Sequence, residues 1–548
     1  MRAVIDIETD GLDATTIHCV CIKQVGVGEV KTYTSPLGLQ QYLDCFDSLI
    51  AHNGLGFDFP TLARLWGIKV RFDQMVDTLI LSTMQDPARE NGHSLRSWGD
   101  RLGYAKENYR GDFSNFSNDL QHYCEQDVRL CERVYTTLRG FMKDFTSQSI
   151  RDEHRMRLVA DRVSSYGFKI NREKTVELFN RLMKEQDSIS VECKSLFPDK
   201  VIQRYSAKTG NRLKDKVEQF NPASRKQIGE RLVELGWKPR VFTETGQAKV
   251  DEKTLSGCNL EVAQKLARYF LLQKRTSQIK SWLELCSDNS RVHCQYRTLG
   301  AITNRMSSAK PNLQQIPSVR VTYGTECREV WEAGEGSKLI DTDASGLELR
   351  VLAHYMKDDN FTKEVLHGDI HTANQQMAGL ENRPQAKTFI YALLYGAGDE
   401  KIGAVVGGSA RDGARLRRRF LTNLPAYKRL SEAVQKKGRE EGRLKAIDGR
   451  VLRVRHPHAS LNTLIQGSSA VLMKKWFMYV DHHLRRFKLD ARIVAMVHDE
   501  LVLECREKDI ALAQKCVILS ISLVNSSYKL RCKLDCDMQI GNNWSEIH

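Results

Sequence analysis

Over the first 150 residues, short apolar runs alternate with longer segments in which apolar residues recur at helical spacing. The apolar runs are rich in β-branched residues and predict strands at Ala3–Ile7, Ile17–Ile22 and Ser48–His52. Helical spacing over Phe116–Leu138 predicts a long helix. Strands that alternate with helices in this way predict an α/β domain.

Residues 151–290 instead predict long helices. The apolar spacing indicates helices at Arg151–Tyr166, Arg172–Leu196 and Leu260–Cys286. The polar, basic stretch Tyr205–Lys216 separates the second helix from the third, and we expect it to be an exposed loop.

From residue 291 onward the pattern is mixed. Lys338–Asp343, Arg492–Val497 and Leu501–Glu504 predict buried strands, and residues 359–485 are mostly helical in spacing. A chain of 548 residues is long enough for about three or four domains.

Charge is distributed unevenly along the chain, whose formal net charge is +15. Residues 1–150 hold 20 acids and 15 bases, a net of −5, and the remainder holds 48 acids and 68 bases, a net of +20. A basic body predicts a polyanionic partner such as nucleic acid, although a soluble basic protein without such a partner has the same charge. An acidic first domain fits carboxylates gathered around metal ions.

Several functional classes are not supported. We see no apolar run near the 18 or so residues of a membrane-spanning helix, and no secretory signal. We therefore expect a cytoplasmic protein that does not associate with a membrane. The 14 cysteines form no CxxC pair, which favours reduced thiols. The chain also lacks the GxxxxGK[ST] motif of P-loop nucleotide hydrolases.

A first set of candidate residues lies in the acidic N-terminal part. Asp6 and Glu8 are two apart on a predicted strand, so both carboxylates face the same side. Asp58 follows a glycine-containing turn, and Asp127 lies one helical turn after Tyr123 on the same helix face.

In order and spacing, these five residues resemble the DEDDy 3′–5′ exonucleases. The resemblance implies an RNase H-like domain that hydrolyses phosphodiesters with two divalent cations, which carboxylate oxygens suit. It implies that Asp6, Glu8, Asp58 and Asp127 bind metal and that Tyr123 orients the attacking water. Asp77 lies near this region, and we interpret it as structural.

A second set of candidate residues lies in the basic body. Asp343 ends one apolar run, and Asp499 lies between two others in a predicted hairpin. Between these two acids, a predicted helix carries two cations and two aromatic rings spaced four apart: Arg383, Lys387, Tyr391 and Tyr395. A cationic, aromatic helix face suits a triphosphate with a base above it.

These segments resemble family A DNA polymerases, the class of bacterial DNA polymerase I. DASGLELR (343–350) resembles motif A, RPQAKTFIYALLYG (383–396) motif B, and VHDE (497–500) motif C. TNRMSSAKPNLQQIP (303–317) resembles the primer-side motif of the same family. The resemblance covers essentially the whole chain and is closest to the replicative polymerases of T-odd-type podoviruses.

The resemblance implies a role for each matching residue. Asp343 and Asp499 would bind two Mg²⁺ ions, or Mn²⁺, with Glu500 nearby. His371, Arg383 and Lys387 would hold the triphosphate, and Lys387 would protonate the leaving group. Tyr391 would pack on the nucleotide and hydrogen-bond to Glu348, which would exclude a ribose hydroxyl. The implied DNA contacts are Arg305, Tyr395, Gln466 and His498.

The implied fold is α/β and multidomain, an exonuclease domain followed by a right-hand polymerase. Residues 1–150 would be the exonuclease domain, 151–290 mainly the helical thumb, 291–358 and 486–548 the mixed palm, and 359–485 mainly the helical fingers. The implied partners are primer–template DNA and dNTPs, with a helicase-primase or single-strand-binding protein as further candidates.

Two departures from the family pattern affect these expectations. Asn304 stands where the family usually has glycine. The thumb segment near Phe197–Phe220 is too short for the insertion by which the phage relatives capture thioredoxin. We therefore expect no thioredoxin clamp.

Two other functions remain open at this level. A single-subunit RNA polymerase uses a similar pair of aspartates, although Glu348 and a proofreading domain argue against it. A non-catalytic nucleic-acid-binding protein would show the same charge distribution, although the intact acid sets argue against a decayed site.

Overall fold

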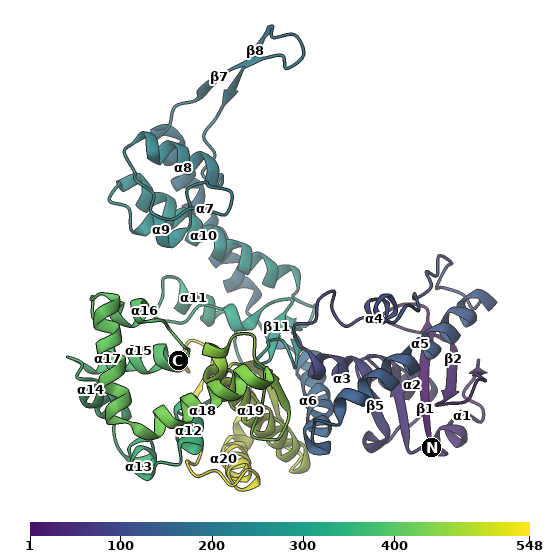
Figure 1. The fold of residues 1–548 in the computed structure, drawn as a ribbon. Coiled ribbons are helices and arrows are strands. Elements are labelled where there is room, and N and C mark those ends of the chain that lie inside the picture. Colours follow the sequence, from purple (N-terminus) through teal and green to yellow (C-terminus); the bar gives the residue numbers. More distant parts are fainter. The chain divides into compact units, whose positions relative to one another are not determined.

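The structure is a computed structural model that describes residues 1–548, and it divides into two compact units (Figure 1). The first unit comprises Met1–Tyr166, Cys294–Gln314 and Glu335–Ile540. The second comprises Gly167–His293, Gln315–Gly334 and Gly541–His548.

The N-terminal part of the first unit is a five-stranded sheet between helices, in the order β3-β2-β1-β4-β5. β2 pairs antiparallel with β1 and β3, whereas β1, β4 and β5 run parallel. The strands are β1 (Arg2–Thr9), β2 (Ile17–Gln24), β3 (Lys31–Tyr33), β4 (Ser48–Ala51) and β5 (Met75–Asp77). The helices are α1 (Leu39–Asp44), α2 (Asp58–Trp66), α3 (Thr78–Gln85), α4 (Leu95–Leu102), α5 (Asn118–Met142) and α6 (Ser147–Tyr166).

Strand β1 contributes side chains to a separate hydrophobic core on each face of this sheet. Ile5 and Ile7 belong to the core that includes residues of α2, and Val4 belongs to the core that includes residues of α5. Because side chains alternate along a strand, a central strand buried on both faces reads as a continuous apolar run. The predictions of strands near residues 3, 17 and 48 and of a helix from about residue 116 are confirmed.

A second sheet in the first unit has the order β15-β16-β12-β17. Its strands are β12 (Ser337–Ala344), β15 (Ala491–Val497), β16 (Glu500–Arg506) and β17 (Cys536–Gly541). The predicted strands at 338–343, 492–497 and 501–504 are confirmed. Helix α19 (Ser460–Arg486) packs against α12 (Leu347–Met356), α20 (Ile510–Ser527) and β15. The short strands β10 (Gln295–Arg297) and β11 (Ser307–Ala309) pair with each other.

The predicted helical region between these strands is confirmed, with one small addition. It contains α13 (Asp359–His367), α14 (Ile370–Ala378), α15 (Arg383–Leu394), α16 (Asp399–Ala404), α17 (Ala410–Asn423) and α18 (Pro425–Glu441). A short hairpin, β13 (Arg443–Lys445) with β14 (Val451–Arg453), follows α18.

The second unit is built on two long helices, α7 (Arg172–Leu196) and α10 (Glu261–Glu284), which pack against each other. Both were predicted with nearly these bounds. At one end, the rings of Phe168, Trp282, Trp331 and Trp544 form a buried cluster with centroids 5.3–6.3 Å apart. The smaller elements are α8 (Arg225–Glu234), α9 (Glu252–Ser256), α11 (Gly324–Glu329) and the strand pair β6 (Phe168–Lys169) with β9 (Arg291–Val292).

The prediction of a loop at Tyr205–Lys216 is wrong, because the segment belongs to a β-hairpin that projects from this unit (Figure 1). β7 (Lys200–Tyr205) pairs antiparallel with β8 (Arg212–Glu218). Most side chains on both strands are exposed, including Val201 and Val217. With neither face buried, the sequence lacks the apolar and polar alternation that identifies a strand.

One helix also departs from the expectation about apolar runs. Glu507–Ser527, which contains α20, is long and apolar enough to cross a membrane when judged by length and composition alone. In the structure α20 packs against α19, where Trp476 Nε1 donates to the Val517 carbonyl at 3.2 Å and His483 Nδ1 lies 2.9 Å from Ser520 Oγ. A core helix of a folded domain passes the same test.

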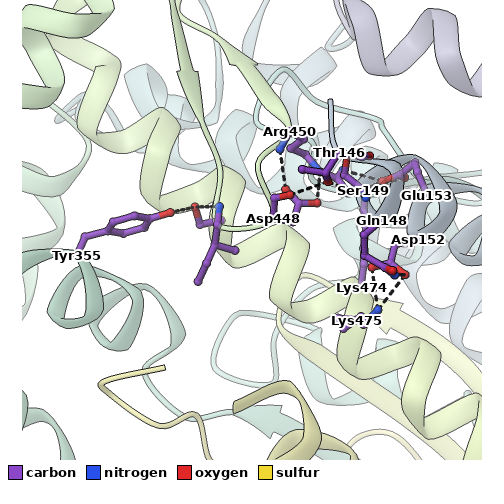
Figure 2. A network of polar contacts seen from close by, with 12 residues as sticks. Thr146, Gln148, Ser149, Asp152, Glu153, Tyr355, Asp448, Arg450, Lys474 and Lys475 are labelled. Atoms are coloured by element: carbon purple, nitrogen blue, oxygen red, sulfur yellow. Dashed lines mark hydrogen bonds and ion pairs between the residues drawn. The ribbon is translucent and has the colours of Figure 1, made fainter. Parts of the chain in front are cut away.

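A buried ion network joins α6 to α19 (Figure 2). The Glu153 carboxylate of α6 has no exposed surface and accepts hydrogen bonds from Arg450 Nη1 at 2.7 Å and Lys474 Nζ at 2.8 Å. Lys475 makes a parallel pair with Asp152 at 2.8 Å. Burial alone would raise the pKa of Glu153, but the charges of Lys474 and Arg450 outweigh burial and hold that pKa below its ordinary value.

The same network includes the turn between β13 and β14. Arg450 Nε donates to Asp448 Oδ2 at 2.8 Å, and Thr146 Oγ1 donates to the Asp448 carbonyl at 2.9 Å (Figure 2). The buried guanidinium of Arg450 thus binds two carboxylates, those of Asp448 and Glu153. Its bond to Glu153 connects segments about 300 residues apart in the chain.

We predict that Glu153→Ala lowers the free energy of unfolding by about 3–5 kcal/mol, because Arg450 and Lys474 then lack a buried counter-charge. Urea denaturation of the full chain measures this loss. The matched control is Glu440→Ala, which removes an exposed carboxylate 4.0 Å from Lys436 and should cost about 0.5 kcal/mol or less. Equal losses in the two variants would contradict a stabilising role for the network.

Candidate active sites

The four N-terminal carboxylates predicted from the sequence meet on the α5 side of the five-stranded sheet. Asp6 and Glu8 lie on β1, Asp58 is the first residue of α2, and Asp127 lies on α5. Glu8, Asp58 and Asp127 are 8%, 3% and 4% exposed, and Asp6 is partly exposed. Sharing a buried space, these carboxylates create a strongly negative site.

The electrostatics of this site disfavour four ionised carboxylates without a cation. Burial, and then the charges of Asp58, Asp127 and Glu8, raise the pKa of Asp6. Burial, followed by Asp127, raises the pKa of Glu8 to about 8, and burial is also the main cause that raises the pKa of Asp58 to about 7. Divalent cations would relieve this repulsion, and carboxylate oxygens are the ligands that Mg²⁺ and Mn²⁺ prefer.

Lys106 is a member of this site that the sequence analysis missed. Its ammonium forms an ion pair with Asp127 and lies 4.6 Å from the ring centroid of Tyr123. Tyr123 and Asp127 share a face of α5, as their spacing predicts. Lys106 lies between α4 and α5, in a segment without periodicity, so only the tertiary structure brings it to the acids.

Asp77 is structural, as predicted, because it organises the turn that precedes Asp58. Its carboxylate accepts hydrogen bonds from the backbone N–H groups of Asn53 at 3.0 Å, Leu55 at 3.1 Å and Leu79 at 2.9 Å. Gly54 is required in this turn, since a Cβ there would lie 2.4 Å from the Ala51 side chain.

The two predicted acids of the basic body lie at adjacent strand ends in the second sheet. Asp343 is near the end of β12, opposite Glu500 of β16, and Asp499 lies in the turn between β15 and β16. The Ala344 backbone N–H donates to the Asp499 carbonyl at 3.0 Å, which joins the two segments. Asp343 is exposed and Asp499 half-buried, so both carboxylates can reach a cation from solvent.

Two residues beside these acids adopt left-handed backbone conformations. His498 in the β15–β16 turn has φ 54°, and Asn304 has φ 59°. Asparagine tolerates this region better than most residues with a Cβ. Asn304 therefore keeps the positive φ that a glycine would supply, and Arg305 follows it.

The Glu348 carboxylate is held by two side chains. Arg305 Nη2 donates to one oxygen at 2.5 Å, and the Tyr395 hydroxyl donates to the other at 2.9 Å. We expected Tyr391 to make this bond, but the residue one turn later, at the C-terminal end of α15, makes it. Tyr391 remains close: burial, and then the charges of Glu348, Asp499 and Asp343, raise its pKa.

The cations predicted on the helix Arg383–Leu394 are exposed at its N-terminal half. Arg383 Nε donates to Asp369 Oδ2 at 2.8 Å, and Asp369 also caps α14, which carries His371. Burial, and then the charges of Arg383 and Lys387, lower the pKa of His371, so these two cations lie close to an imidazole that favours its neutral form.

Among the predicted DNA contacts, Arg305 and His498 lie together, and Gln466 is placed on α19. Arg305, His498 and Asp499 line one small cavity with residues of α19 that include Lys474. Gln466 is half-buried on the same helix.

A family model described as DNA polymerase family A matches residues 199–546. This chain belongs to DNA polymerase family A.

Within this family, the chain is 30% identical to the DNA-directed DNA polymerases of Enterobacteria phage T3 and Escherichia phage T7, over all of each chain. These alignments span 707 and 703 positions, so the relatives contain residues without a counterpart among the 548 here. DNA polymerase I of Pseudomonas aeruginosa is 29% identical over 60% of this chain and 39% of its own.

Among solved structures, the chain is similar to the POL domain of Pol1 from M. smegmatis in complex with DNA primer-template and dNTP. The TM-score is 0.82, with 18% identity, over 100% of this chain and 95% of that chain. This likeness confirms the predicted polymerase fold. Because the phage relatives that match over the whole chain are DNA-directed DNA polymerases, this family A protein is a DNA-directed DNA polymerase. The alternatives of an RNA polymerase and a non-catalytic binding protein are therefore set aside.

We predict that Glu8→Gln stabilises the metal-free polymerase at alkaline pH. The pKa of Glu8 is about 8 in the folded chain against an ordinary value of 4.5. The folded state therefore binds more protons between these values, and stability falls as pH rises through that window. Glutamine does not ionise, so its advantage over wild type should exceed about 1 kcal/mol above pH 8.

Urea unfolding in EDTA measures this difference at two pH values, one near the ordinary glutamate pKa of 4.5 and one above pH 8. Glu29→Gln, at an exposed position of the same domain, is the matched control and should show no such trend. A parallel pH dependence for wild type and Glu8→Gln would contradict the prediction.

Proposed function

We propose that residues 1–150 are a 3′–5′ exonuclease domain that proofreads for the polymerase. The observation that carries this proposal is the convergence of Asp6, Glu8, Asp58 and Asp127 in one buried space beside Tyr123. Burial raises the pKa of all four carboxylates, and neighbouring acids raise it further for Asp6, Glu8 and Asp58, an arrangement that suits cation binding better than stabilisation of the fold.

In this proposal the four carboxylates hold two divalent cations, Mg²⁺ or Mn²⁺. When bound, such ions activate water and stabilise the departing 3′ oxygen. The Tyr123 hydroxyl orients the water. Lys106, beside the Tyr123 ring and paired with Asp127, holds both side chains at the edge of the acid cluster.

We also propose the roles of the polymerase residues. Asp343 and Asp499, at adjacent strand ends, hold the two Mg²⁺ ions that polymerase chemistry requires. Arg383 and Lys387 bind the triphosphate through their positive charges, His371 binds it by hydrogen bonding, and Lys387 protonates the pyrophosphate leaving group. Tyr391 packs on the incoming nucleotide.

Glu348 selects the sugar, because its carboxylate fills the space that a ribose hydroxyl needs. Its two bonds to Arg305 and Tyr395 support this role, since both oxygens are fixed in direction. Tyr395 also lies near the template base. Arg305, Gln466 and His498 contact the duplex or the primer end.

We propose the domain limits given by the family resemblance: thumb at 151–290, palm at 291–358 and 486–548, and fingers at 359–485. Primer–template DNA and dNTPs are the proposed partners, and the enzyme acts in the cytoplasm of its host cell. A helicase-primase or single-strand-binding protein is a further candidate partner. We expect no increase in product length when thioredoxin is added.

We predict that the two active sites can be inactivated separately. Asp6→Ala combined with Glu8→Ala should abolish degradation of a labelled 3′ end and leave extension of a matched primer nearly unchanged. Asp499→Ala should abolish extension and leave degradation. Both activities are measured in Mg²⁺, and exposed controls are Glu29→Ala and Glu507→Ala. A folded variant that loses both activities would refute two separate sites.

We predict that Tyr391→Phe raises discrimination against dideoxynucleotides by at least about tenfold. The tyrosine hydroxyl can replace the missing 3′-OH as a hydrogen-bond partner, and an unpaired buried group costs about 1–3 kcal/mol. Single-nucleotide insertion in the exonuclease-deficient background measures the ratio.

Two further variants test this assignment in the same assay. Glu348→Ala should relax exclusion of ribonucleotides. Tyr395→Phe removes the hydroxyl that holds Glu348, so it should relax exclusion of ribonucleotides but leave dideoxynucleotide use unchanged. Strong rejection of dideoxynucleotides by the wild type would show that Tyr391 does not face the sugar.

A further inference from the structure

Three cysteines converge behind the N-terminal acid cluster. Cys19 and Cys21 lie on β2 and Cys124 on α5, and each is fully buried at 0% exposure. Their sulfur atoms all lie within 4.8 Å of one another. No other part of the proposed function uses them.

Strand register explains why the thiols meet. Cys21 is opposite Asp6 and Cys19 is opposite Glu8 in the antiparallel pairing of β1 with β2. Directly opposite residues project from the same face of a sheet, so the two thiols and the two acids all face α5. Cys124 of α5 completes the group.

The thiol group is continuous with the acid cluster. Cys124 Sγ lies 3.5 Å from Asp6 Oδ2 and 3.5 Å from the Asp6 carbonyl oxygen. Asp6, Glu8 and Cys124 also place one ligand atom each within 4.8 Å. Asp6 is the partly exposed member of this group, whereas the three thiols are fully buried.

We propose that Cys19, Cys21 and Cys124 bind one divalent cation of the zinc class, with the Asp6 carboxylate as fourth ligand. Zinc–sulfur bonds of about 2.3 Å place tetrahedral sulfurs about 3.8 Å apart, and the three sulfurs here already lie within 4.8 Å of one another. Thiolates select such borderline-soft ions over Mg²⁺. Each thiol releases its proton to water as its sulfur binds.

The sharing of Asp6 gives this site a regulatory consequence, which rests on the proposed exonuclease function. A cation held by the three sulfurs takes Asp6 away from the Mg²⁺ ions of the exonuclease site. Occupancy should therefore suppress 3′–5′ degradation and leave primer extension, at a different set of acids, unaffected.

The binding test uses the reduced full-length protein, freed of metal by chelation, in excess Mg²⁺ and a Cys45→Ser background that removes an exposed thiol. Titration with Cd²⁺ should give sulfur-to-metal absorption that saturates at one ion per chain. Substitutions of residues that only support the ligands typically weaken metal binding by about 10–100-fold. Because Cys21 is a proposed ligand itself, Cys21→Ser should weaken Cd²⁺ binding by more than that.

Cys131→Ser is the matched control, because Cys131 is buried in the same core on α5 but lies outside the group of three. It should retain the absorption and the affinity. Absence of sulfur absorption in the wild type, or equal affinity of the Cys21→Ser variant, would show that the thiols are only packed side chains. Far-UV circular dichroism and the urea-unfolding midpoint of each variant report folding.

The activity test measures exonuclease rate with Zn²⁺ divided by the rate without it, both in excess Mg²⁺. This ratio should fall at least about tenfold for wild type and Cys131→Ser but stay near one for Cys21→Ser. Equal suppression in all three would place the inhibitory zinc on the acids alone and overturn the proposal. If wild type shows no exonuclease activity, the proposed function fails, and the Cd²⁺ titration still decides whether the site exists.

Discussion

Helix α6 carries the buried contacts on which both acidic sites depend. Glu153 of this helix binds Arg450 and Lys474, whereas the next residue, His154, accepts the backbone N–H of Asp77 at 2.9 Å through Nε2. Lys474 lines the cavity beside Asp499, and Asp77 holds the turn that precedes Asp58. Successive residues of one helix therefore contact the residue that holds the turn before Asp58 and the lysine that lines the cavity beside Asp499.

Repulsion between neighbouring carboxylates is reduced in a different way at each of the two acidic sites. At the N-terminal site the carboxylates are buried together, so their pKa values rise and Lys106 neutralises part of the charge. At the second site, Asp343 is exposed at a strand end, and solvent screens its charge.

Local patterns predicted the elements with a buried face, and long-range contacts explain what was missed. Helix Arg172–Leu196 was predicted with the bounds that the structure has, because its apolar residues repeat regularly. The hairpin at Lys200–Glu218 was missed because neither face is buried. Lys106 and the partners of Glu153 could not be predicted, since their contacts span about 20 and about 300 residues.

The position of Glu348 illustrates the limit of spacing arguments. A four-residue repeat places Tyr391 and Tyr395 on one helix face, but it does not say which hydroxyl reaches the carboxylate. Helix α15 ends at Leu394, and Tyr395, whose backbone N–H still donates to the Tyr391 carbonyl at 2.9 Å, is the residue whose hydroxyl meets Glu348. Because Arg305 takes the other oxygen, one buried carboxylate fixes side chains from two distant segments. A carboxylate bonded on both sides has little freedom to rotate, so residues far apart in the sequence fix the direction of its two oxygens.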